Sequence, residues 1–231
     1  MIIDIFCDAS ISTTEYNETI GCAMAIAIDR STGQELDRMY DIRRASTNNN
    51  SEIAAISLAV DIALKFNNPS NIITIFSDSN ICVKGLTEWI YGWNKKIVNN
   101  LMISSSNEPV ANQLQILTVV RKIVYNNLAL NILHQKGHVY SNAQLVKAKH
   151  TFAKSNNINE YDVSDEFIKY ISAKNDEVDC GSRVYLIDYI NYNVEEKLEQ
   201  APISPYVIKQ SLKEYGRLIK RRKEVYTTYG S

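Results

Sequence analysis

Three acidic residues in this chain stand where a strand ends or a helix begins. Asp8 closes the apolar stretch IIDIFCD, Asp78 closes NIITIFSD, and Glu52 lies in the first turn of an expected helix. In an open α/β sheet, ligands gather where strands terminate, so these side chains could meet on one surface. Carboxylates held a few ångströms apart repel unless a cation or a proton intervenes, and their hard oxygens suit Mg²⁺ or Mn²⁺. The acids therefore indicate a divalent-metal site.

Each acid also has an ordinary explanation. Glu52 suits a helix N-terminus, Asp78 could cap the helix that follows it, and Asp8 could begin a turn. Taken singly, each acid is better explained by these structural roles. The functional interpretation therefore depends on the sequence around all three.

Hydrophobic periodicity predicts the elements that must position the acids. IIDIFCD and GCAMAIAID read as strands, and a tight turn containing Gly33 joins the second of them to a third strand, QELDRMYDIRR. Apolar residues at helical spacing predict a helix over residues 51–66, which Pro69 cannot continue. The strand NIITIFS follows, and a further helix is expected to begin near Ser79.

The second half of the chain continues this alternation. PVANQLQILTVVRKIVYNN predicts a long helix with Pro109 in its first turn, LALNILHQ a strand, and NDEVDCGSRVYLIDYI an amphipathic helix. Residues 139–174 are polar, with helix-like pieces. A last helix is expected after Ser204, with the basic segment KRRK (220–223) at its end. Strands alternating with helices after a three-strand meander predict an α/β domain with a mixed sheet.

Composition limits the class of protein. The chain has 231 residues, 45% of them hydrophobic and 22% charged, and its four cysteines are scattered, which argues against zinc sites and disulfide frameworks. No apolar run approaches the roughly 20 residues of a membrane span, so we expect a monomeric cytoplasmic protein with no membrane partner. The net charge of −1 argues against binding nucleic acid by bulk attraction, so any contact with a polyanion must be local.

The sequence around the acids resembles one family. After the strand end FCDAS, the chain carries TNNNSE, SDSNICVKGLTEWIYGW and QKGHV in that order. These stretches resemble type 1 ribonuclease H, whose pattern has an Asp on strand one, T-N-N-x-x-E on the first helix, D-S after strand four and K-G-H after strand five. Asp8, Glu52 and Asp78 match the acids. The resemblance implies a ribonuclease H-like fold, a five-stranded mixed β-sheet flanked by α-helices.

The fourth acid of the family pattern, in N-x-x-x-D, is displaced in this chain. In the family it follows K-G-H within a few residues, whereas Val146, four positions after Asn142, cannot bind a metal. Asn175, Asp179 and Arg183 have the family spacing N-x-x-x-D-x-x-x-R, so we assign Asp179 as the fourth carboxylate. The competing choices are Asp162, Asp165, Asp176 and Asp188.

This assignment sets the expected domain boundaries. A ribonuclease H domain would span residues 1–190, with residues 139–174 as an insertion between the His loop and the last catalytic helix. Surface loops tolerate such length at modest entropic cost. Residues 191–231 would form a C-terminal helical extension. We expect no hybrid-binding module before Asp8 and no attached polymerase domain.

The resemblance implies an endoribonuclease that hydrolyses the RNA strand of RNA/DNA hybrids and leaves 5′-phosphate and 3′-hydroxyl ends. In a two-metal-ion mechanism, Asp8 would bridge two Mg²⁺ ions, for which Mn²⁺ is an alternative, and Asp78 would join it at the ion that activates water. Glu52 and Asp179 would hold the other ion. His138, in K-G-H, would shuttle a proton or help product leave. Two further histidines match no part of the pattern and read as structural or exposed, namely His134 and His150.

Candidates for substrate contact lie beside the acids. Asn48 and Asn49 could read 2′-hydroxyls, and Asn80 stands where the family often has Gln. TEWIYGWNKK resembles the basic protrusion with which many family members grip the DNA strand, although it holds fewer Lys and Arg. Turn chemistry, capping and packing are the alternatives for all of these. The candidates in the protrusion are Trp89, Trp93, Lys95 and Lys96.

Two rival functions remain open at this point. A ribonuclease H-like protein that binds nucleic acid without catalysis is expected if Asp179 does not reach the other acids. A nuclease of the same superfamily with another duplex substrate, DNA or RNA alone, is the second rival. Ala9, where the family commonly has Gly, is a departure close to the expected position of the scissile phosphate.

Overall fold

The computed structural model describes residues 1–14, 17–44, 47–93, 95–99 and 101–197. For residues 192–197 the description is limited to the helical backbone. The helix expected after Ser204 and the KRRK segment lie outside the described residues. The expected division at residue 190 therefore stays a prediction.

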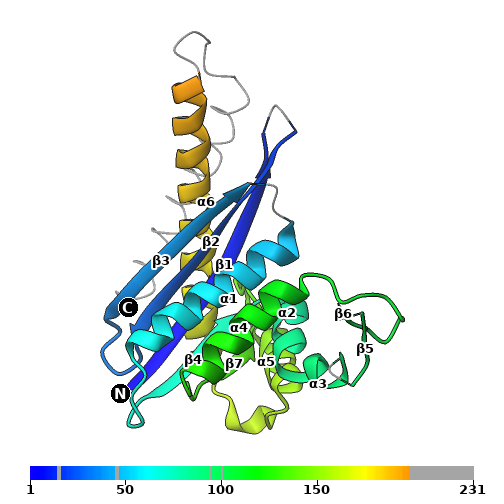
Figure 1. Ribbon diagram of the computed structural model, residues 1–231. Coiled ribbons are helices and arrows are strands. Elements are labelled where there is room, and N and C mark those ends of the chain that lie inside the picture. The colour runs from blue at the N-terminus through cyan, green and yellow to red at the C-terminus, as the bar shows by residue number, and fades with distance from the viewer. Residues whose placement is uncertain (15–16, 45–46, 94, 100, 198–231) are drawn as a thin grey trace.

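A five-stranded mixed sheet forms the centre of the molecule (Figure 1). Its spatial order is β3-β2-β1-β4-β7, in which β1–β2 and β2–β3 are antiparallel and β1–β4 and β4–β7 are parallel. This is the mixed sheet that the sequence predicts. The strands are β1 (Ile2–Thr13), β2 (Thr19–Asp29), β3 (Glu35–Arg44), β4 (Ile72–Ser77) and β7 (Asn131–His134).

Asp8 lies within β1 rather than at its end, so the expected strand end is wrong. β1 continues to Thr13 because its antiparallel pairing with β2 extends along this whole segment. The parallel pairing of β1 with β4, however, stops at Phe6. Asp8 therefore lies just past the last residue of β1 that pairs with β4, and Asp78 is the residue that follows β4. The pairing pattern brings both acids to the carboxyl end of β4.

One face of the sheet is covered by α1 (Asn48–Lys65) and α4 (Gln113–Tyr125) (Figure 1). The small and aliphatic residues of α1 bury almost every turn of this helix against β1 and β2. Thr47 is its N-cap, and its Oγ1 accepts a hydrogen bond from the backbone nitrogen of Asn50. The helix thus begins earlier than predicted, and Glu52 lies in its second turn rather than its first.

The predicted start of α4 at Pro109 is also wrong. Pro109 forms an isolated antiparallel bridge with Ile103, and Val110 donates a backbone hydrogen bond to Met102, so this segment is extended. The helix begins four residues later at Gln113, after Asn112 in a left-handed conformation. Short elements lie between β4 and this bridge: α2 (Asn80–Lys84), the π-helical turn η1 (Gly85–Trp89), α3 (Ile90–Trp93), β5 (Ile97–Val98) and β6 (Leu101–Met102).

The other face is covered by α5 (Asn142–Asn156), the short 3₁₀ turn η2 (Glu160–Asp162) and α6 (Asp165–Lys197). Their apolar side chains form a second core with Phe6 and Phe76 of the sheet. The region over residues 139–174 therefore contains one complete helix and the beginning of α6, and it supplies much of this core. Among the described residues, no helix combines the length and the apolar character that a membrane span requires.

Candidate metal centre

Three carboxylates from three different elements meet at the carboxyl end of β4. Asp8 of β1, Glu52 of α1 and Asp78 each offer one carboxylate oxygen, and these oxygens all lie within 4.8 Å of one another. Asp8 and Glu52 are only 5% and 6% exposed, and Asp78 is half-buried. The acids that the sequence marks at separate element ends are thus brought together by the fold.

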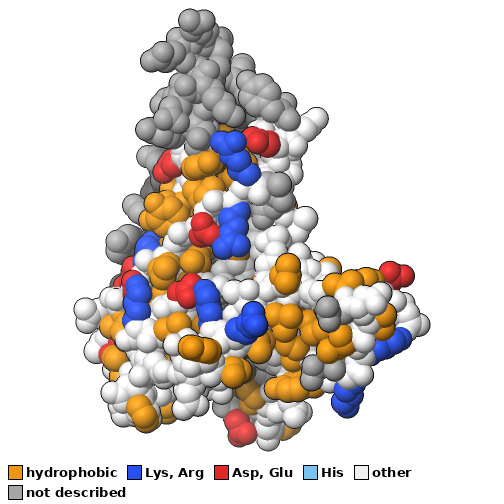
Figure 2. All heavy atoms as spheres, viewed as in Figure 1, with side chains coloured by type: hydrophobic (Ala, Val, Ile, Leu, Met, Phe, Trp, Pro, Cys, Tyr) orange, Lys and Arg blue, Asp and Glu red, His pale blue; other side chains and the backbone are white. Residues whose placement is uncertain are grey.

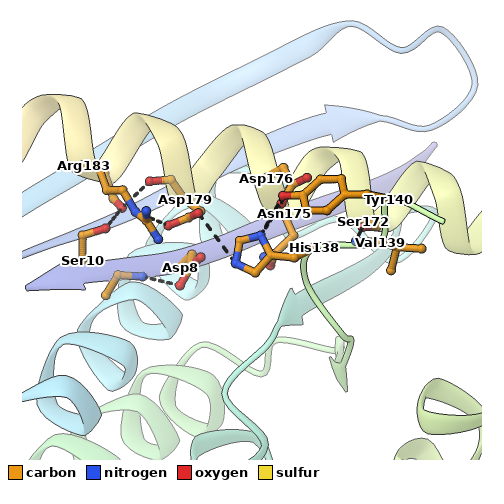
Figure 3. A network of polar contacts seen from close by, with 12 residues as sticks. Asp8, Ser10, His138, Val139, Tyr140, Ser172, Asn175, Asp176, Asp179 and Arg183 are labelled. Atoms are coloured by element: carbon orange, nitrogen blue, oxygen red, sulfur yellow. Dashed lines mark hydrogen bonds and ion pairs between the residues drawn. The ribbon is translucent and has the colours of Figure 1, made fainter. Parts of the chain in front are cut away.

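Asp179 of α6 faces these acids from the other side of the site. It is 3% exposed, and its negative charge raises the pKa of Asp8, of Glu52 and of Asp78. Its Oδ1 lies 2.7 Å from Nε of Arg183, which is the Arg four residues later in the N-x-x-x-D-x-x-x-R pattern. Figure 3 shows Asp179 on α6 with Asp8 on the strand beneath it. The position of Asp179 is therefore compatible with the fourth-carboxylate assignment, which stays a prediction.

Small residues of α6 allow the helix to approach the sheet closely at this point. A β-carbon at Gly181 would lie 2.5 Å from Sδ of Met24, which is fully buried in β2. The hydroxyls of Ser182 and Ser10 share a buried hydrogen bond of 2.7 Å. Sequence reasoning missed these contacts. The pair of small residues two and three positions after Asp179 was the signal that could have indicated a close helix–sheet approach.

Burial is the largest cause of the raised pKa values in the cluster. It raises the pKa of Glu52 from 4.5 to about 8, with the charges of Asp78 and Asp179 as further causes. The pKa of Asp8 is raised by burial and then by the charges of the other acids. Burial also raises the pKa of Asp78, although a positive charge on His138 and the amide of Asn175 lower it. Without a cation, the cluster therefore retains protons near neutral pH.

The donor set fits a hard divalent cation. Asp8, Glu52 and Asp78 supply only oxygen atoms, which Mg²⁺ and Mn²⁺ prefer. The Oε2 atom of Glu52 is buried and has no hydrogen-bond partner among the described residues. A buried carboxylate oxygen without a donor costs free energy that a bound cation would recover.

The asparagines of the expected substrate surface are exposed. Asn48 and Asn49 lie in the first turn of α1, where Thr47 performs the capping, and Asn80 begins α2. Capping therefore does not account for Asn48 and Asn49, which leaves their role in reading 2′-hydroxyls as a prediction.

The aromatic residues of the expected protrusion have different surroundings. Trp93 is half-buried, packs against the core under α1, and lies 3.4 Å from where a β-carbon of Gly85 would be. Trp89 is 40% exposed, and its ring centroid is 6.0 Å from that of Trp93. Packing against the core thus explains much of the position of the Trp93 side chain. Figure 2 shows hydrophobic side chains gathered over the region of α3, β5 and β6, with basic side chains at its edge. Lys95 and Lys96 are exposed, and Lys96 donates to Asn107.

The two other histidines have the structural or exposed positions that the sequence predicts, although His134 also contacts the backbone of Asp78. His134 is buried at the end of β7, and its backbone nitrogen donates to Asn156. His150 is exposed on α5, and its Nδ1 lies 2.9 Å from a carboxylate oxygen of Glu160. Asp165, one of the acids that compete with Asp179 for the fourth-carboxylate assignment, forms an ion pair with Lys149.

Two proteins named Ribonuclease H are similar in sequence to part of this chain. A protein named Ribonuclease H from Saccharopolyspora erythraea is 31% identical over 80 residues, which cover 35% of this chain and 47% of that protein. Another of the same name, from Pelobacter propionicus, is 33% identical over 111 residues, covering 48% and 60%. The matched part of the chain thus spans about half the length of these curated relatives.

Comparison of structures supports the same fold. The solution structure of the PFV RNase H domain superimposes with a TM-score of 0.50 at 16% identity, covering 68% of this chain and 96% of that domain. The family model described as RNase H matches residues 2–164, so Asp8, Glu52 and Asp78 lie within the match and Asp179 lies beyond it. Because this match covers well over half of the sequence, the chain belongs to the RNase H family.

Proposed function

We propose that this protein is a type 1 ribonuclease H that hydrolyses the RNA strand of RNA/DNA hybrids and leaves 5′-phosphate and 3′-hydroxyl ends. The observation that carries the proposal is the convergence of Asp8, Glu52 and Asp78, whose oxygens lie within 4.8 Å of one another inside a fold of the RNase H family. The names of the two curated relatives support the same reaction.

The cluster would hold two Mg²⁺ ions, with Mn²⁺ as an alternative. The charges of all three other acids act on Asp8. Asp8 would contribute to both ions, Asp78 would share one ion with it, and Glu52 and Asp179 would hold the second. Bound there, such ions supply a water nucleophile of lowered pKa and neutralise the negative charge that develops on the phosphate. Because Asp8 and Glu52 are buried, their carboxylates have little access to bulk water and would gain from binding a cation.

The surrounding residues would position the duplex and move a proton. His138 lies at the rim of the cluster with its Nε2 atom 3.9 Å from Oδ2 of Asp179, where it can hand a proton to the leaving oxygen or help product leave. Asn48 and Asn49 would contact 2′-hydroxyls from the exposed start of α1. Side chains of α2 and the protrusion would also contact the hybrid, namely Asn80, Trp89, Trp93, Lys95 and Lys96.

The deciding experiment is cleavage of an RNA/DNA hybrid labelled on either strand, in Mg²⁺ and separately in Mn²⁺. Duplex DNA and duplex RNA serve as comparison substrates. Asp78→Asn should lower hybrid cleavage at least about 100-fold, because it removes a charged ligand. Asp37→Asn is the matched control, because Asp37 lies on β3 away from the site and pairs with Lys65 at the end of α1. Digestion of the downstream product by an exonuclease that requires a 5′-phosphate would identify that end, and extension of the upstream product by a polymerase would identify the 3′-hydroxyl.

Each outcome decides between the proposal and its rivals. Cutting of the RNA strand of the hybrid alone, lost in Asp78→Asn and kept in Asp37→Asn, supports ribonuclease H. Cutting of duplex DNA or duplex RNA instead supports a nuclease with another substrate. No cleavage of any substrate in either ion, together with binding of the hybrid, supports a nucleic-acid-binding protein that has lost catalysis.

A further inference from the structure

The loop that carries His138 is attached to one face of α6 (Figure 3). The backbone nitrogen of Val139 donates to Oγ of Ser172 at 3.1 Å, and the His138 ring contacts Asp176 and Asp179. Ser172, Asp176 and Asp179 are spaced by four and three residues, so they form one stripe along the helix. The same helix that supplies Asp179 therefore also holds the histidine loop.

The ring of His138 is held at its Nδ1 atom by two side chains. Nδ1 lies 2.9 Å from Oδ1 of Asp176 and 3.0 Å from the hydroxyl of Tyr140. The Tyr140 hydroxyl in turn donates to the same oxygen of Asp176 at 3.3 Å. Because an ionised carboxylate only accepts hydrogen bonds, this contact favours the hydrogen on Nδ1. The second ring nitrogen, Nε2, is then the one that faces Asp179.

The backbone of this loop is held in a conformation that it would not adopt freely. His138 has a φ of 62°, in the left-handed region that costs free energy for a residue with a side chain. Such a conformation persists when surrounding contacts enforce it. His138 and Asp176 are 38 residues apart, with all of α5 between them, so the covalent chain does not set their distance. Their contact does.

We propose that Asp176 is a positioning residue for the active site: with Tyr140, it holds the His138 ring so that Nε2 points at the carboxylate cluster. This inference rests on the proposed function, because the orientation of the ring has a catalytic purpose only if the site cleaves nucleic acid. The side chain of His138 is 44% exposed. A contact at such a site adds little to folding stability, so its main effect is on the orientation of the ring.

The first test measures the ring itself in the metal-free protein. The chain has three histidines, so long-range ¹H–¹⁵N spectra at pH 8 can be assigned with a His138→Ala variant. The wild-type protein should show the hydrogen of His138 on Nδ1, and Asp176→Ala should move the ¹⁵N shifts toward the tautomer mixture of free imidazole. Glu177→Ala is the matched control, since the neighbouring Glu177 pairs with Lys174 on the same helix. Unchanged shifts in Asp176→Ala would overturn the proposal.

The second test is a double-mutant cycle on hybrid cleavage. Asp176→Ala should lower kcat about tenfold with KM unchanged, and Tyr140→Phe should lower it less. In a His138→Ala background, Asp176→Ala should have no further effect, because its role passes through the ring. Equal losses in both backgrounds would show that Asp176 acts independently of His138. If the wild-type protein cleaves nothing, the proposed function fails, while the ¹⁵N shifts still decide whether Asp176 orients the ring.

Discussion

Gly137 lies directly against the side chain of Asn175, and a β-carbon at residue 137 would be 2.8 Å from the amide nitrogen. The same β-carbon would be 3.3 Å from Oδ2 of Asp78. Asn175 cannot yield easily, because it is fully buried and its Oδ1 accepts a 2.6 Å hydrogen bond from Gln135. The glycine of the K-G-H motif thus allows the histidine loop to lie against both α6 and the cluster.

Gly137→Ala should therefore disturb the site more than the fold. The added methyl group must displace Asn175, Asp78 or the loop, and a shift of about 1 Å among catalytic groups can cost roughly 100-fold in rate. We expect kcat on a hybrid substrate to fall at least about tenfold. Gly92→Ala is the control, because nothing lies within 4 Å of its β-carbon position. Wild-type kcat in Gly137→Ala would contradict this account of the motif.

Asp78→Asn should stabilise the metal-free protein although it removes activity. At pH 8 the substitution removes one of several like charges that burial forces together. The free energy of unfolding should therefore rise, because burial and the charge of Asp179 both disfavour the ionised form of Asp78. Thermal unfolding in EDTA measures the change, with Asp37→Asn expected to differ little from wild type. A lower melting temperature for Asp78→Asn would argue against mutual repulsion within the cluster.

The stability of the metal-free protein should fall as the pH rises from about 5 to 8. Glu52 has a pKa of about 8 in the folded protein and 4.5 as its ordinary value. Across this interval the folded state binds more protons than the unfolded chain, so each increase in pH favours unfolding. Urea unfolding at several pH values checks the slope. Glu52→Gln should flatten it, and Mg²⁺ should do the same by replacing the protons. Stability that increases over this range would refute the prediction.

Arg30 and Arg38 offer a comparison of two ion pairs with similar geometry. Arg30 donates to both oxygens of the fully buried Asp4 at 2.7 and 2.6 Å, and Arg38 donates to both oxygens of Glu35 at 2.8 and 2.7 Å on the surface. Arg30→Ala leaves a buried carboxylate without its counter-ion and should cost about 3–5 kcal/mol. Arg38→Ala should cost less than about 1 kcal/mol. Chemical denaturation of both variants provides the measurement, and equal losses would contradict it.

The sequence was sufficient to find Asp8, Glu52 and Asp78, because each lies in a motif of short range. It was less informative about their exact place in the elements. The strand β1 continues past Asp8 because of pairing with β2, which depends on residues far away in the chain. The start of α1 is set by Thr47, whose capping contact is visible only in the folded backbone.

The extent of α6 was the largest difference between prediction and structure. The predicted helix began at Asn175, whereas α6 begins at Asp165. One reason lies in Ser172, a buried polar residue that interrupts the apolar periodicity of the helix before Asn175. A pattern based on hydrophobicity reads such residues as solvent-exposed. Asp4 was missed for a similar reason, since burial of a paired carboxylate leaves no hydrophobic signal.

The continuity of α6 has a consequence for how this chain can change in length. Asp179 is carried by an unbroken helix that begins at Asp165, so deletion of one residue between them would rotate its carboxylate by about 100° around the helix axis. Residues 157–164 connect α5 to α6 outside this helix. Changes of length there alter the connection without altering the helical phase of Asp179. Insertions and deletions should therefore be tolerated in residues 157–164. Between Asp165 and Asp179 they should be selected against, because they would turn the Asp179 carboxylate away from the site.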